Sequence, residues 1–132
     1  MSKPFGYSYL LDMGGCKPGV CDDLETIYRF LENLCEKIGM TPMAPVYVLH
    51  GPRKNGVEVF PDKAGVSGVQ FLIESAIVLH AMEPTHFITL DVYSCGCFDP
   101  EIVKQYAQET FEFTEGESHF IERGTKYPRK DS

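Results

Sequence analysis

Four side chains that can do chemistry on a carbonyl group lie within one third of this chain. Ser75 is followed by His80 five residues later and by Cys95 twenty residues later, and Ser67 precedes it by eight. A hydroxyl can attack a carbonyl, an imidazole with a pKa of about 6.5 exchanges protons, and a thiol with a pKa of about 8.5 can donate one. Taken singly, such residues are usually a turn serine, a core histidine and a buried cysteine. Composition alone therefore identifies no site.

Three short motifs contain these residues in a fixed order. They are G-V-S-G-V at 65–69, E-S-x-x-x-x-H at 74–80 and D-V-Y-S-C-G at 91–96. In this order and without a gap, they resemble the bacterial and archaeal S-adenosylmethionine decarboxylase proenzyme family. The resemblance extends more loosely to Asp12-Met13-Gly14-Gly15-Cys16 and to Asp99-Pro100. It covers most of the chain, and three ordered motifs with matching spacing are fairly specific.

The resemblance implies an enzyme that makes its cofactor from its own chain. Ser75 Oγ would attack the carbonyl of Glu74 and convert that peptide bond into an ester. Elimination and hydrolysis would then split this single domain into a β chain, 1–74, and an α chain, 75–132, with a pyruvoyl group at position 75. Its ketone would condense with the substrate amine and withdraw the electrons released as CO2 leaves, as pyridoxal phosphate does elsewhere. The implied reaction is decarboxylation of S-adenosylmethionine in polyamine biosynthesis.

The family pattern also suggests a role for each candidate residue. Cys95 is expected to return a proton to the substrate carbon after CO2 leaves, because a thiol is mostly protonated at neutral pH. His80 and Ser67 are expected to assist cleavage of the peptide bond. Glu83 and Asp12 are the candidate substrate-binding residues, and no metal is implied.

The sequence departs from the family pattern at three places. Ala76 stands where a second histidine usually follows the processing serine. The usual His-Thr-Trp-Pro-Glu reads His80-Ala81-Met82-Glu83-Pro84, which displaces by one position the glutamate expected to bind the ribose hydroxyls. Gly51-Pro52 replaces an aromatic residue expected to stack on adenine. These departures concern the substrate more than the cleavage chemistry.

Two alternatives follow from these departures. The first is the same scaffold acting on ornithine or arginine, with Glu83 or Asp12 holding the distal cation; the displaced glutamate and the missing aromatic residue favour it. The second is an uncleaved, non-catalytic homologue with a binding or regulatory role, which only Ala76 suggests.

Composition limits the class of protein and its partners. The chain has 132 residues, 43% of them hydrophobic, which suits one small domain. A net charge of −7 argues against nucleic-acid binding.

We expect a cytoplasmic chain without membrane contact, because no signal sequence and no long apolar run is found. The five cysteines are odd in number and read as reduced thiols; Cys16, Cys21, Cys95 and Cys97 have atypical spacing for zinc.

Alternating and helical patterns predict the elements that position these residues. Two helices are expected, one beginning near Asp22 as a capping-box start with Glu25 and one at Asp99-Pro100. The segment 51–64 is expected to be an exposed hairpin or loop. Strands are expected at 5–12, 44–49, 66–73, 76–82, 86–93 and 110–122. This order predicts an α+β two-layer sandwich, a mainly antiparallel sheet with two helices on one face. The uncovered face suggests association, and the resemblance implies a homodimer of αβ protomers with active sites near the interface.

Overall fold

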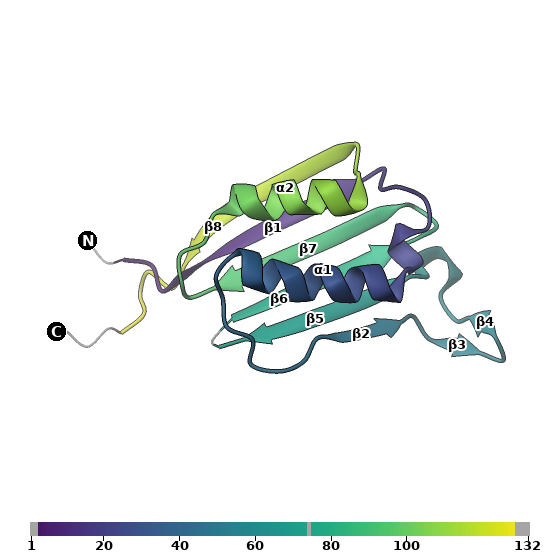
Figure 1. Ribbon diagram of the computed structural model, residues 1–132, viewed down its shortest axis with the longest axis horizontal. Coiled ribbons are helices and arrows are strands. Elements are labelled where there is room, and N and C mark those ends of the chain that lie inside the picture. Colours follow the sequence, from purple (N-terminus) through teal and green to yellow (C-terminus); the bar gives the residue numbers. More distant parts are fainter. Residues whose placement is uncertain (1–2, 74, 129–132) are drawn as a thin grey trace.

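A computed structural model describes residues 3–73 and 75–128 and shows a main six-stranded sheet with two helices on a single face (Figure 1). The sheet order is β2-β5-β6-β7-β1-β8, and every neighbouring pair is antiparallel. The six strands are β1 (Gly6–Gly14), β2 (Tyr47–His50), β5 (Val66–Leu72), β6 (Ser75–Met82), β7 (Phe87–Ser94) and β8 (Glu115–Arg123). The predicted α+β two-layer class is confirmed.

The helices are α1 (Leu24–Lys37) and α2 (Pro100–Phe111). Asp23, not Asp22, caps α1: its Oδ1 accepts the Thr26 N–H at 3.1 Å, and this bond holds the pKa of Asp23 below its usual value. The predicted cap at Asp22 is wrong because that carboxylate contacts His50. Asp99 caps α2 as predicted, with Pro100 in the first turn.

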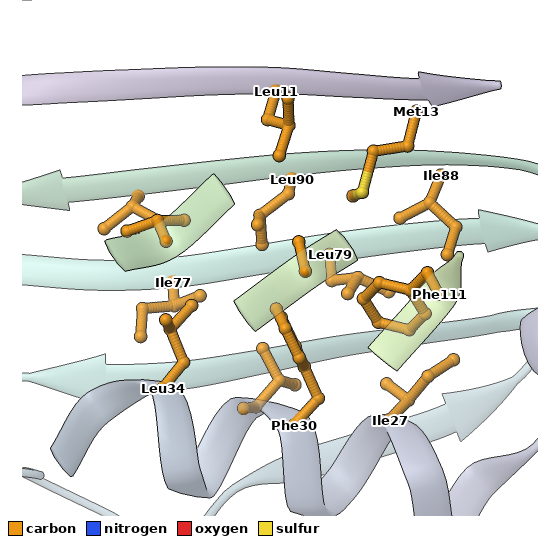
Figure 2. Close-up of a cluster of buried hydrophobic side chains, with 14 of the residues drawn as sticks. Leu11, Met13, Ile27, Phe30, Leu34, Ile77, Leu79, Ile88, Leu90 and Phe111 are labelled. Atoms are coloured by element: carbon orange, nitrogen blue, oxygen red, sulfur yellow. The ribbon is translucent and has the colours of Figure 1, made fainter. Parts of the chain in front are cut away.

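The core fills the space between the helices and the sheet (Figure 2). Phe30 and Leu34 of α1 and Phe111 of α2 pack against strand residues such as Leu79 and Leu90, and all five are at most 1% exposed. Burial of each such side chain contributes about 1.5–3 kcal/mol, so the helix layer and the sheet stabilise each other.

The opposite face of the sheet carries no helix (Figure 1). Burial alternates along β6: Ser75 and Leu79 point to the helices, whereas His80 and Met82 point to this open face. Exposed apolar side chains also lie on it, for example Leu49 at 72% and Phe71 at 47%. The association predicted from an uncovered face stays a prediction.

The segment 51–64 forms a hairpin, as predicted. Its strands are β3 (Arg53–Lys54) and β4 (Val57–Glu58), joined by Asn55 and Gly56 with φ of 53° and 78°. Positive φ at both turn residues is typical of a tight type I′ hairpin. A single turn of 3-10 helix, η2 (Pro61–Lys63), leads back to β5. We call residues 51–64 the ribbon.

Candidate active site

Ser75 and Cys95 lie in contact at one end of the sheet. Ser75 is the first residue of β6, directly after the β5–β6 turn, and is 9% exposed. Its Oγ accepts the Cys95 backbone N–H at 3.1 Å and lies 3.9 Å from the Cys95 sulfur. A backbone N–H aimed at this oxygen would stabilise negative charge there. Glu74, the other half of the predicted cleavage bond, lies outside the described residues.

The side chain of Ser94 holds the bend that contains Cys95 in place. The Ser94 hydroxyl is fully buried, accepts the Gly96 N–H at 3.0 Å and lies 3.2 Å from the Met40 sulfur. The backbone of β1 passes so close that a Cβ on Gly6 would lie 2.3 Å from the Ser94 carbonyl oxygen. These contacts leave the Cys95 N–H and thiol facing Ser75.

Ser67 and His80 form a second pair on the open face. They are register partners on β5 and β6, and Ser67 Oγ lies 2.9 Å from His80 Nδ1. A hydroxyl bonded to an imidazole is the arrangement in which a base accepts a hydroxyl proton. These two predicted residues lie next to each other because the register of the β5–β6 hairpin places Ser67 opposite His80.

The predicted catalytic residues therefore fall into two separate pairs. Ser75 and His80 are five residues apart on β6, which is about 17 Å at the rise of a β-strand. An odd separation also places them on opposite faces. Within one chain, His80 and Ser67 do not reach the predicted cleavage bond.

Asp12 lies on the open face, in the same row as His80. Asp12 is the register partner of Thr89, and Thr89 is the partner of His80. Asp91, two residues along β7, was given no role by the sequence. Burial and the charge of Asp12 raise the pKa of Asp91, and His80 opposes the shift. An acidic residue inside a strand is unusual, which is a signal that could have marked it.

The Glu83 carboxylate binds the backbone of the segment that follows β1. Its two carboxylate oxygens accept the backbone N–H groups of Gly19 at 2.7 Å and Cys21 at 3.1 Å. Nδ1 of His86 lies 3.4 Å away. The substrate-binding role predicted for Glu83 stays untested, but each of its oxygens already has a structural partner.

A cavity of about 350 Å³ opens beside Ser67 and His80. Met82 and the ribbon residues Glu58, Phe60 and Lys63 also line it. Phe60 is 60% exposed, as an aromatic ring available for stacking would be. The sequence reading missed these ribbon residues, although Phe60 is the one aromatic residue between 51 and 64.

His50 pins the ribbon to the rest of the chain. Its Nε2 contacts Asp22 Oδ1, and its Nδ1 lies 3.0 Å from the Gly51 carbonyl oxygen. The Gly51 carbonyl and the Asp22 carboxylate raise the pKa of His50, whereas Arg53 opposes this. Arg53 Nε in turn donates to Glu58 Oε1 at 2.7 Å.

Residues 3–73 and 75–128 contain no group of three or more histidine, cysteine, aspartate or glutamate side chains arranged to hold a metal. In the same residues, no helix is both long and apolar enough to cross a membrane.

Known proteins are similar to this chain in sequence and in architecture. A solved adenosylmethionine decarboxylase from Aquifex aeolicus superposes with a TM-score of 0.76 at 22% identity, covering 99% of this chain and 98% of that one. The S-adenosylmethionine decarboxylase proenzyme of Pyrococcus furiosus is 33% identical over 122 residues, 90% of this chain and 78% of that protein. The same-named protein of Thermodesulfovibrio yellowstonii is 29% identical over 108 residues, 81% and 72% of the two chains. The family model described as S-adenosylmethionine decarboxylase matches residues 7–124, and the chain belongs to this family.

Proposed function

We propose that this chain is a pyruvoyl-dependent decarboxylase that converts S-adenosylmethionine to its decarboxylated form and CO2. The observation that carries the proposal is the contact of Ser75 Oγ with the N–H and the thiol of Cys95. Family membership favours neither ornithine nor arginine as the substrate, and it does not favour an uncleaved homologue.

Ser75 suits the origin of a pyruvoyl group. It begins a strand directly after a turn, where cleavage of the preceding bond would leave a free end without breaking the ladder of β6. Once formed, the group supplies an electron-withdrawing carbonyl next to an amide. The Cys95 N–H would stabilise negative charge at this position, and its thiol would hold a proton within reach of the substrate carbon.

A homodimer would bring the two halves of the site together. Two open faces can pack about a two-fold axis that runs between the sheets and across the strands. Such an axis reverses the strand direction, so the Ser67–His80 pair of one chain would lie over the Ser75–Cys95 end of its partner. The exposed apolar side chains of this face, such as Leu49 and Phe71, would be buried in the contact.

The cavity beside His80 would take the nucleoside part of the substrate. It is lined mainly by apolar side chains, and Phe60 offers a ring face at its rim. Aromatic and apolar linings with a few polar groups are typical of small-molecule sites. Phe60 would thus supply the stacking residue that the sequence lacks at Gly51-Pro52. Such an enzyme would act in the cytoplasm.

Intact-mass analysis followed by CO2 assays tests this function. The purified chain is expected as two pieces, 1–74 and 75–132, the second with a blocked N-terminus, while Ser75→Ala stays intact. Carbon dioxide release is then compared for S-adenosylmethionine, ornithine and arginine. A chain that keeps its full mass at neutral pH contradicts the pyruvoyl proposal, and a preference for either amino acid contradicts the substrate.

A further inference from the structure

The cavity beside His80 has an unusual balance of charge. Of the described residues that line it, Glu58 carries the single carboxylate and Lys63 the single ammonium group. Glu83 does not line the cavity, and backbone N–H groups hold both of its oxygens. A carboxylate contact to a ligand in this cavity would therefore come from the ribbon.

Glu58 is held in a defined orientation. It is the register partner of Arg53 across the ribbon, and its side chain is 22% exposed. Arg53 Nε donates to Oε1 at 2.7 Å, and His50 Nε2 lies 3.6 Å from the same oxygen. Within residues 3–73 and 75–128, no group donates a hydrogen bond to Oε2, so this oxygen can accept one from a ligand.

The surrounding charges decide what kind of donor would bind. Arg53 already neutralises the Glu58 carboxylate, and Lys63 adds a positive charge to the same cavity. This excess of positive charge would repel a cationic ligand group but not a neutral hydroxyl group. An ionised carboxylate also forms stronger hydrogen bonds with hydroxyl groups than neutral acceptors do.

We propose that Glu58, through Oε2, recognises the ribose hydroxyls of the nucleoside bound in this cavity. The inference rests on the proposed function for the nature of the ligand. It makes Glu58 a specificity-determining residue on the ribbon and gives Glu83 a structural duty instead.

The test uses the uncleaved Ser75→Ala chain, because the cavity is present without cleavage. Calorimetry measures the affinity for 5′-methylthioadenosine and for its 2′-deoxy form. We expect the hydroxyl to raise affinity by about 10- to 100-fold, the range for a hydrogen bond to a charged group. Adding Glu58→Gln should bring this preference down to about threefold or less, because the neutral amide is a weaker acceptor.

Glu58→Gln could weaken binding either by loosening the ribbon or by removing the hydrogen-bond acceptor. The ratio of the affinities for 5′-methylthioadenosine and its 2′-deoxy form distinguishes the two causes. Loss of the Arg53 pairing would weaken both ligands equally, whereas loss of the acceptor removes only the preference. Asp62→Asn removes a charge from the same segment without touching the cavity and should keep the preference.

Three results would overturn the inference. They are an unchanged preference in Glu58→Gln, no binding of either nucleoside, and a Glu58→Gln effect confined to S-adenosylmethionine, which would make Glu58 a partner of the sulfonium. Failure of the proposed function is a separate result, because self-cleavage and CO2 release are measured on the wild-type chain.

Discussion

Ser75 and His80 lie on the same strand, β6, five residues apart and on opposite faces of the sheet. The hydroxyl that would be consumed in cleavage points to the helix layer, and the imidazole that would assist it points to the open face. Within one chain the two residues also lie about 17 Å apart along the strand. A reaction that uses both residues would take them from two chains, as in the proposed homodimer, and activity would then depend on dimer formation.

Complementation between two inactive variants tests this link. Ser75→Ala and His80→Ala chains should each stay uncleaved alone. After co-expression in equal amounts, half of the dimers would be mixed and each would hold one complete site, so cleavage should reach about one quarter of the wild-type level. Mass spectrometry should find the 75–132 fragment carrying the His80→Ala change. A fragment without that change, or no fragment at all, would contradict a shared site.

Replacement of Cys95 should separate cleavage from turnover. The bond to Ser75 Oγ comes from the Cys95 backbone N–H, which Cys95→Ala keeps. We expect some cleaved protein with decarboxylation slower by about 10²–10⁴-fold, as for loss of one positioned acid. Cys97→Ala, at an exposed thiol two residues away, is the matched control and should turn over normally. Normal turnover by a fully cleaved Cys95→Ala enzyme would remove the thiol from the mechanism.

Much of the fold could be predicted because its patterns are local. Alternating burial marks the strands, and Asp99-Pro100 marks the start of α2. Boundaries were less accurate: the last strand begins at Glu115 instead of position 110 because α2 continues to Phe111. Asp22 was misread as a helix cap because its partner, His50, is distant in sequence.

The sequence predicted residues for the candidate site, but it did not predict their arrangement. Spacing identifies Ser75 and His80, and only the strand register shows that they face opposite sides. Phe60 and Glu58 were missed because they reach the cavity through a hairpin that follows His50, and His50 contacts Asp22, 28 residues earlier in the chain. Distant pairings of this kind leave no periodic signal in the sequence.

Glu83→Gln should act on stability more than on the substrate. The amide keeps one acceptor oxygen for Gly19 or Cys21 but presents an NH2 group to the other N–H. Loss of one charged hydrogen bond at this partly exposed site should cost about 1–2 kcal/mol. Thermal unfolding should therefore shift downwards, with KM for S-adenosylmethionine changed less than threefold. A sharp rise in KM at an unchanged unfolding temperature would instead place Glu83 against the substrate.

The contact between His50 and Asp22 should make ligand affinity depend on pH. The Gly51 carbonyl and the Asp22 carboxylate raise the pKa of His50 above its unfolded value of about 6.5. The stabilisation is then fully present below that pH and is lost as pH rises through the higher folded pKa. Because the protonated ring holds the ribbon that lines the cavity, affinity of the Ser75→Ala chain for 5′-methylthioadenosine should fall as pH rises above about 6.5.

Two variants assign this pH dependence to His50. His50→Gln should bind weakly at every pH in the range, and its affinity profile should be flat. Asp22→Asn removes one cause of the raised pKa, so the fall in affinity should move to lower pH. Glu58 and Arg53 are the other charged groups that face the ring. A wild-type profile in His50→Gln would show that another group controls the ribbon.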